Sequence, residues 1–136
     1  MSDNIKSIEN SLFFQCENLK NIDIPNGVER IGHHAFGSCY SLQYIEIPSS
    51  VKCIEEGAFY CCINLSTVTI HEGISTIGNG AFASCYSLCS IKIYSVDCTI
   101  FDSSSTIESD ATIYSYANST AQAYAEKYNR AFVAIG

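Results

Sequence analysis

Cysteines are the residues of this sequence with the widest chemical potential, because thiols form disulfides, bind zinc and act as nucleophiles. Four of the eight recur at one constant spacing: Cys16, Cys39, Cys62 and Cys85. If copies of a repeat stack on one another, such cysteines lie in a straight row, whereas zinc requires a tetrahedron of ligands. We therefore interpret this series as packing, in which a small and weakly polar side chain fills a tight bend.

The other four cysteines, Cys53, Cys61, Cys89 and Cys98, fall outside that series. No C-x-x-C motif is present, and the C-x-x-x-C at 85–89 joins a buried position to a strand position. A disulfide among these four thiols remains an open alternative. No metal site is expected.

His33, His34 and His71 are the candidate general bases, and Glu55 with Glu56 forms a short acidic pair. A catalytic base needs a partner fixed in place, yet the positions of these residues carry unrelated side chains in the other copies. Such variable positions are typical of solvated surface. Nucleophile-elbow, phosphate-loop, zinc-protease and calcium-loop patterns are all absent. We therefore expect neither an enzyme nor a bound cofactor.

The spacing of the four cysteines extends to many other positions, so that it defines a 23-residue period. It relates Phe13, Phe36, Phe59 and Phe82, and it also relates Leu19, Leu42, Leu65 and Leu88. Further apolar series in the same phase begin at Ile5, Ile8, Ile22 and Ile24. Seven or eight apolar columns in a single phase identify a repeat protein.

Each copy reads approximately V-x-x-I-x-x-x-A-F-x-x-C-x-x-L-x-x-I-x-I, and its end alternates in the manner of a strand, as in 42–47. Pro48 closes this strand, as Pro25 closes the preceding one. A single copy is too short to bury its own apolar side chains. Stacked copies would bury them as continuous columns, with their strands about 4.8 Å apart.

Composition limits the classes of partner. The chain has 136 residues, 47 % of them hydrophobic, and a formal net charge of −7, with only seven Lys and Arg residues. Disorder is not expected, and a surface without a basic patch does not favour nucleic acid as a partner. No run of apolar residues is long enough to span a membrane, and the polar start MSDNIKSIENSL does not resemble a signal peptide.

The repeated pattern resembles the BspA-like leucine-rich repeat family, which carries the same A-F-x-x-C-x-x-L-x-x-I-x-I signature. Residues 5–94 match it in four consecutive copies. The resemblance implies a mainly β repeat solenoid, a right-handed horseshoe with short parallel strands on its concave face and a helix-strand cap at the C-terminus. We assign the four repeats to 5–27, 28–50, 51–73 and 74–96, within residues 1–96. Residues 97–136 are assigned to a degenerate repeat, which starts to decay at Asp97, and to the cap of the same domain.

The two ends of the array differ. At the C-terminus, Asn118 or Ser119 begins a helix whose apolar stripe covers the last coil, and 131–135 reads as a closing strand. The stripe consists of Ala121, Tyr124, Ala125 and Tyr128. The N-terminus shows no comparable lid. Either the chain is the C-terminal portion of a longer array, the alternative that we favour, or the polar start protects the edge by itself.

Outward-facing positions of the strands form the candidate binding face, because Tyr44 and Glu46 must point away from the core if Ile45 and Ile47 point into it. Its ten residues are Asn21, Asp23, Tyr44, Glu46, Thr67, Thr69, His71, Ser90, Lys92 and Tyr94. The acidic end of these rows favours a basic patch on a partner. A second candidate surface contains Tyr40, Ile63 and Tyr86, and an ordinary solvated surface without a ligand is a third alternative.

These observations favour a non-enzymatic module that binds a protein or glycan partner. The family resemblance further implies a cell-surface or secreted protein of a microbe that adheres to macromolecules of a host or a neighbouring cell. Two alternatives remain open. The repeats could be a structural stalk that only spaces another domain from the surface. They could instead form an intracellular scaffold, which the many cysteines and the absence of a signal peptide would suit.

Overall fold

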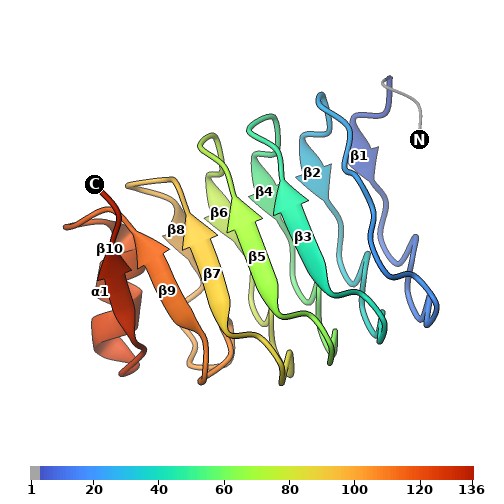
Figure 1. The fold of residues 1–136 in the computed structure, drawn as a ribbon. Helices are drawn as coiled ribbons and strands as arrows, with labels where there is room; N and C mark the ends of the chain where they lie inside the picture. Colours follow the sequence, from blue (N-terminus) through green and yellow to red (C-terminus); the bar gives the residue numbers. More distant parts are fainter. Residues whose placement is uncertain (1–3) are drawn as a thin grey trace.

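Two parallel sheets run side by side along the computed structural model, which describes residues 4–136 (Figure 1). The long sheet, which holds the longer strands, has the order β10-β9-β7-β5-β3. Its members are β3 (Tyr44–Ile47), β5 (Thr67–Ile70), β7 (Ser90–Ile93), β9 (Thr112–Ser115) and β10 (Phe132–Ala134). Each turn of the chain adds a strand beside the previous one, so the predicted mainly β solenoid is confirmed.

A short sheet lies behind the long one in Figure 1 and has the order β1-β2-β4-β6-β8. Its strands are β1 (Ser7–Ile8), β2 (Arg30–Ile31), β4 (Cys53–Ile54), β6 (Thr76–Ile77) and β8 (Thr99–Ile100). Alternation of apolar residues does not predict this sheet, because such short strands cannot show an alternating pattern. The column of isoleucines that begins at Ile8 nevertheless supplies the second residue of every strand in it.

The register of both sheets is the sequence period itself. Ile31 pairs with Ile54 in the short sheet and Tyr44 pairs with Thr67 in the long sheet, each with its counterpart one repeat later. Residues of one column therefore lie directly beside one another in successive turns. The fixed letters of the repeat face the core, since β3 buries Ile45 and Ile47 while Tyr44 and Glu46 are exposed.

The phenylalanine column forms a continuous stack inside the solenoid. Phe36, Phe59 and Phe82 are fully buried, and Phe13 in the first turn is half-buried. Centroids of successive rings are 5.2, 5.1 and 5.2 Å apart, and the ring planes are nearly parallel. Such stacked pairs contribute about 0.5–1.5 kcal/mol beyond the burial of their area.

The cysteine column lies beside the phenylalanines and does more than fill space. The thiols of Cys39, Cys62 and Cys85 donate hydrogen bonds to the carbonyls of Phe13, Phe36 and Phe59, at 3.0–3.1 Å. Each thiol thus ties one turn to the previous turn. All eight cysteines of the chain are free thiols in this structure, including the four outside the column.

Burial keeps the thiols of Cys39, Cys62 and Cys85 protonated at neutral pH. Removal from water raises the pKa of Cys39 from 9.0 to about 11 and that of Cys85 to about 12, because the thiolate loses hydration. The same cause raises the pKa of Cys62 further. A neutral thiol neither binds zinc nor acts as a nucleophile, which agrees with a packing role.

Two further columns mark the bends between the sheets, because their residues have a left-handed backbone. One column has positive φ at Ser11, His34, Gly57 and Gly80, and the other at Gln15, Ser38, Cys61 and Ser84. This conformation is strained for residues with a Cβ atom, so glycine at 57 and 80 fits it best. Cys61, which lies outside the cysteine column, is thus a bend residue.

The fifth turn continues the stack although its sequence departs from the repeat. Thr99 in β8 keeps the regular register with Thr76. Ile107, however, pairs with Phe82 two positions later than the period predicts, and Thr112 pairs with Ser90 one position earlier. An insertion followed by a deletion therefore restores the ladder. Ile107 is buried at the end of the phenylalanine stack.

The start of the fifth turn also departs from the repeat. Phase alone places a column residue at Asp97, where the repeats have Val or Ile. The structure buries Cys98 completely at this point and leaves Asp97 exposed. The buried position has therefore moved by one residue along the chain.

The C-terminal segment forms the predicted helix and strand. Helix α1 (Thr120–Lys127) is capped by Ser119, whose hydroxyl accepts a hydrogen bond from the backbone N–H of Gln122 at 3.1 Å. Ala121, Tyr124 and Ala125 are buried, and Tyr128 at the C-terminal end is half-buried. Strand β10 pairs with β9 and becomes the last strand of the long sheet. The helix contacts β8, β9 and β10, so it covers the final coil.

The first turn departs from the prediction. Phase alone places a strand at 21–24, with Asn21 and Asp23 facing outward as Tyr44 and Glu46 do. The structure has no strand at 21–24, and the long sheet ends at β3. The first turn still contributes β1 to the short sheet. It therefore joins the second turn by strand pairing in the short sheet but not in the long sheet.

Replacing Phe59 with alanine tests the phenylalanine stack. Phe59→Ala opens a cavity between two stacked rings and should lower the free energy of unfolding by about 3–5 kcal/mol. Chemical denaturation measures this change, and Tyr44→Ala, at an exposed strand position, should alter stability by no more than about 0.5–1 kcal/mol. A near-neutral result for Phe59→Ala would show that the ring does not support the core.

Thiol chemistry tests the cysteine column. With native protein at pH 8, iodoacetamide should modify the exposed Cys89 readily and leave Cys62 and Cys85 unmodified, as read by mass spectrometry of peptides. Modification of Cys62 as fast as that of Cys89, in protein that keeps its circular dichroism spectrum, would contradict the buried hydrogen-bonded column.

The raised thiol pKa values also set an alkaline limit. The folded state holds the thiol proton of Cys39 up to about pH 11, whereas the unfolded chain releases it near pH 9.0. The contribution of the buried Cys39 thiol to the free energy of unfolding is therefore complete below pH 9 and is lost as the pH rises toward 11. Denaturation at several pH values should show this decline, with a shallower slope for Cys39→Ala.

Candidate functional site

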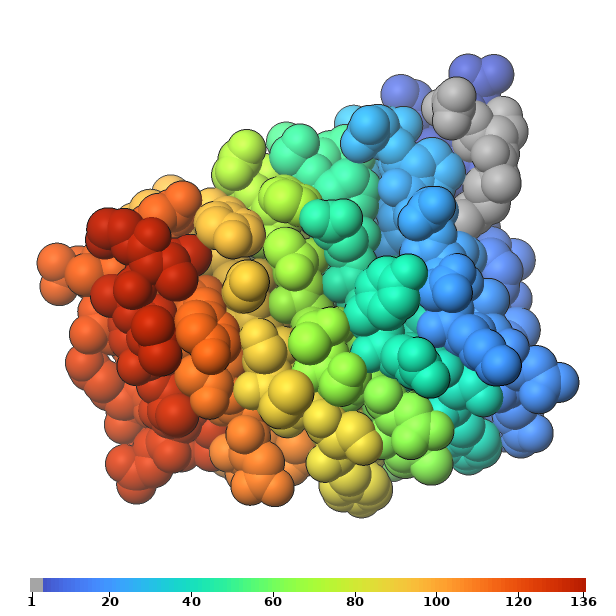
Figure 2. Space-filling model, in the orientation of Figure 1, coloured from blue at the N-terminus to red at the C-terminus, as the bar shows by residue number. Residues whose placement is uncertain are grey.

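The outer face of the long sheet, which we call the long-sheet face, holds eight of the ten predicted binding residues on β3, β5 and β7 or directly after them. These eight are Tyr44, Glu46, Thr67, Thr69, His71, Ser90, Lys92 and Tyr94. Figure 2 views this side of the molecule, where the side chains of successive turns form adjacent bands. Tyr44 is 52 % exposed, whereas Thr69, His71, Ser90 and Tyr94 are half-buried by their neighbours. The structure therefore brings these eight side chains onto one surface.

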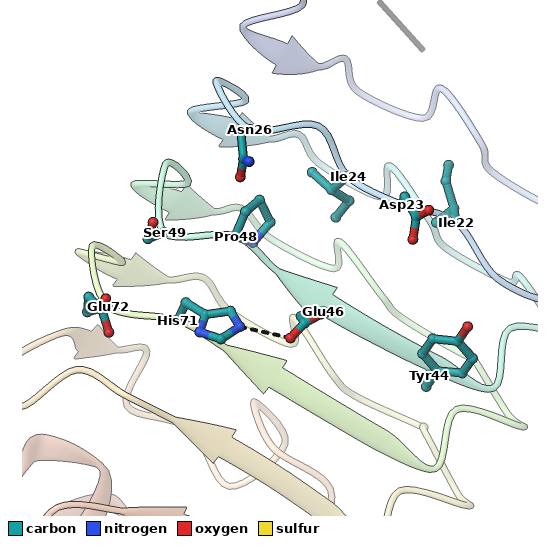
Figure 3. A pocket seen from close by; sticks show the side chains of 10 residues that line it. All are labelled: Ile22, Asp23, Ile24, Asn26, Tyr44, Glu46, Pro48, Ser49, His71 and Glu72. Atoms are coloured by element: carbon teal, nitrogen blue, oxygen red, sulfur yellow. Dashed lines mark hydrogen bonds and ion pairs between the residues drawn. The ribbon is translucent and has the colours of Figure 1, made fainter. Parts of the chain in front are cut away.

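A pocket of about 470 Å³ lies at the N-terminal end of the long-sheet face (Figure 3). Asp23, one of the two remaining predicted residues, lines the pocket from the first turn, and Glu46 lines it from β3. The other lining residues are Ile22, Ile24, Asn26, Tyr44, Pro48, Ser49, His71 and Glu72. Asn21, the last of the ten, is exposed and does not line the pocket. A volume of this size is in the range of small ligand pockets.

The pocket exists because the first turn does not pair with β3. In the next two turns the strand exit is fixed by the backbone N–H of His71, which donates to Ile47, and by that of Tyr94, which donates to Ile70. Pro48 occupies the same column and has no N–H to donate to Ile24. One of the hydrogen bonds that close the later turns therefore cannot form between 21–24 and β3, and the pocket lies between these two segments.

Carboxylates dominate the charge of this pocket. Asp23, Glu46 and Glu72 line it, and none of its lining residues is Lys or Arg. His71 lies 2.9 Å from a carboxylate oxygen of Glu46 through its Nε2 atom. Figure 3 shows this contact and shows the Glu46 side chain directed toward His71. The pocket thus suits a cationic group.

Aromatic rings continue along the same face toward the C-terminus. The ring of His71 stacks on that of Tyr94, with centroids 5.7 Å apart, and Tyr94 meets the edge of Tyr116 at 6.4 Å. Tyr114 on β9 and Tyr116 directly after it are missing from the predicted rows. The fixed period cannot find them, because the register between β7 and β9 is one position shorter than the repeat. The face is therefore more aromatic than the repeats alone indicate.

Among the remaining chemical candidates, His33, His34 and Glu55 are engaged in structural contacts, whereas Glu56 is exposed. A carboxylate oxygen of Glu55 lies 3.1 Å from the Nε2 atom of His33 and 3.7 Å from a guanidinium nitrogen of Arg30. The ring of His34 lies over Gly57, where an added Cβ would come within 2.5 Å of it, and meets the edge of the Tyr60 ring. His34, expected at a solvated position, is thus half-buried by its neighbours.

Residues 4–136 hold neither a cluster of potential metal ligands nor a long apolar helix. In that part of the chain, no group of three or more His, Cys, Asp or Glu side chains is arranged to hold a metal ion. None of its helices is long and apolar enough to cross a membrane.

The second predicted surface is also present on the outside of the solenoid. Tyr86 is 69 % exposed, Ile63 is 37 % exposed and Tyr40 is half-buried. These side chains lie one per turn at the same position of the repeat. None of the three is charged, so this surface offers less to orient a partner than the long-sheet face.

Solved structures support the fold. The T. pallidum leucine-rich repeat protein TpLRR superposes with a TM-score of 0.74 at 23 % identity, and the chain is covered fully while spanning 61 % of that protein. A leucine-rich cell surface protein of Faecalibacterium prausnitzii gives a TM-score of 0.64 at 28 % identity, covering 85 % of this chain and 31 % of the other. The pneumococcal vaccine antigen PcpA gives 0.61 at 18 % identity, covering 97 % and 42 %. No curated protein matches the chain.

The family comparison finds the same type of repeat that the sequence pattern indicates, but it finds more copies of it. The model of the BspA type leucine-rich repeat region matches residues 1–123 in six copies, where spacing predicts four complete repeats and a degenerate fifth. This family and fold are typical of non-enzymatic protein-interaction modules. The stacked turns, the register of the two sheets and this match together show that the chain belongs to the BspA-type leucine-rich repeat family.

Proposed function

We propose that the chain is a protein-binding module that holds a basic segment of its partner on the long-sheet face. The observation that carries this proposal is the pocket between the first turn and β3, whose three carboxylates face no Lys or Arg among the lining residues. A cationic side chain of a partner would enter this pocket and make charge-assisted hydrogen bonds with Asp23 and Glu46.

The remainder of the face would contribute contact area. Tyr44 lies beside the pocket, and the rings of His71, Tyr94 and Tyr116 extend from it across the later turns. Tyrosine is enriched at protein interfaces because its ring buries apolar area while its hydroxyl accepts or donates a hydrogen bond. Net charge supports the same partner, since a chain of charge −7 attracts basic surfaces over distances of about 10 Å.

The setting that we propose is the surface of a bacterial cell, or its secreted fraction, with a role in adhesion. The Faecalibacterium prausnitzii protein that supports this setting is a cell surface protein and is 28 % identical over most of this chain. The chain spans 61 % or less of each of the three solved proteins. The partner and the adhesive role of a complete protein therefore belong to this proposal.

Binding of basic model ligands tests the proposed face. A Lys- and Arg-rich peptide and a basic extracellular-matrix protein should bind the chain and lose at least tenfold in affinity with the double variant Tyr44→Ala, Glu46→Lys, by surface plasmon resonance. The loss should exceed the change caused by Glu17→Lys, an equal change of charge at an exposed loop position away from the pocket.

Two outcomes would contradict the proposal. Equal losses in the double variant and in Glu17→Lys would indicate attraction by net charge without a defined site. Failure of every basic ligand to bind the wild-type chain, with the fold intact by circular dichroism, would favour the structural stalk.

Raising the salt concentration should weaken the specific complex, because part of its affinity is electrostatic.

A further inference from the structure

The segment 21–24 has the sequence of a strand but not the structure of one. It reads NIDI, in phase with the YIEI, TVTI and SIKI of β3, β5 and β7. Its apolar positions already face inward, since Ile24 is buried and Ile22 is half-buried. Only the ladder of hydrogen bonds to β3 is missing.

The two ends of this segment are nevertheless attached to the second turn. The backbone N–H of Gln43 donates to the carbonyl of Lys20 at 3.2 Å, and the Ser50 hydroxyl donates to the carbonyl of Val28 at 2.8 Å. Between these contacts, within the described residues 4–136, no backbone hydrogen bond joins 21–24 to Tyr44–Ile47. The first turn is therefore hydrogen-bonded to the second turn on both sides of this segment, and only 21–24 lacks backbone hydrogen bonds to β3.

Besides the missing N–H of Pro48, charge distinguishes this pair of turns from the next ones. In the register of the repeat, Asp23 would lie directly beside Glu46, whereas Glu46 lies beside Thr69 and Thr69 beside Lys92. Like charges on directly opposed positions destabilise strand pairing. The Glu46 carboxylate is turned toward His71, and Figure 3 shows Asp23 on the separate first turn.

We propose that 21–24 is a conditional sixth strand of the long sheet, held away from β3 by repulsion between Asp23 and Glu46. Neutralising either carboxylate lets the segment close onto β3. In the closed form, by translation of the ladder in the later turns, the N–H of Glu46 donates to Ile22, that of Ile22 to Tyr44 and that of Ile24 to Glu46. Closure fills the pocket with backbone, so in the free chain the pocket exists only while both carboxylates are charged.

This device goes beyond the proposed function, because it concerns the free chain and requires no partner. If the proposed function also holds, the same two carboxylates that bind a basic segment keep its pocket open. A group that neutralises them from solution would then close the pocket without occupying it.

Hydrogen exchange measured by NMR on the free chain tests the conditional strand. In Asp23→Thr, which places in the first turn the residue that Thr69 supplies in β5, the amides of Ile22, Ile24 and Glu46 should exchange at least tenfold more slowly than in the wild type. Asp23→Lys should slow them further, since it places opposite charges side by side. Asp23→Glu keeps the repulsion and should leave the three rates at their wild-type values.

Glu72→Thr is the matched control, since Glu72 lines the same pocket but lies outside the Asp23 column. It should leave the three rates unchanged. Wild-type rates in both Asp23→Thr and Asp23→Lys would overturn the proposal and assign the missing ladder to Pro48 and to the end of the stack alone. Equal slowing in Glu72→Thr would also overturn it, because the effect would then be one of general charge. Since the exchange is measured without ligand, its failure is separate from a failure to bind basic partners.

Discussion

Stacking of identical columns, one repeat apart in the sequence, is the constraint on which the rest of this structure depends. A parallel ladder fixes which residues lie side by side, and here each residue lies beside its own counterpart in the next turn. The phenylalanine stack and the thiol-to-carbonyl hydrogen bonds both require that register. A slip of one residue would expose the apolar column of a strand and bury its polar one. The fifth turn shows how strict the requirement is, because its insertion is followed by a deletion that restores the ladder.

The interior and the outer face are under different constraints. Inside, a column tolerates little change, since Phe59 is in contact with a ring on each side and Cys62 satisfies a carbonyl of the previous turn. Outside, the same spacing presents side chains at regular intervals with no packing demand on their identity. Such a surface can change its chemistry without changing the fold, which is the physical basis of its use for recognition.

The candidate site lies where the stacking rule is only partly satisfied. The first turn joins the short sheet through β1 but leaves the long sheet open at β3. A proline without an N–H and two carboxylates in one column oppose the last ladder, and the consequence is a pocket with acidic walls. Local conflict with the pattern of a fold is often associated with function, because it creates space and unsatisfied groups that a regular stack does not offer.

The sequence by itself determined the repeat, its phase, the inward columns and their stacking in a solenoid, because these follow from spacing and apolar period. Eight of the ten predicted surface residues lie on the strands or directly after them for the same reason. The helix of the cap follows from its capping residues and apolar stripe, and the parallel strands are what the family resemblance implied. Tertiary structure alone decided the short sheet, the partners of the column thiols, the place of Cys98 and the addition of Tyr114 and Tyr116 to the face. It also decided that 21–24 is not a strand. The apolar pattern indicates which side chains face the core. Whether two neighbouring segments pair as strands depends also on backbone N–H donors and on side-chain charges, which only the contact between neighbouring turns brings together.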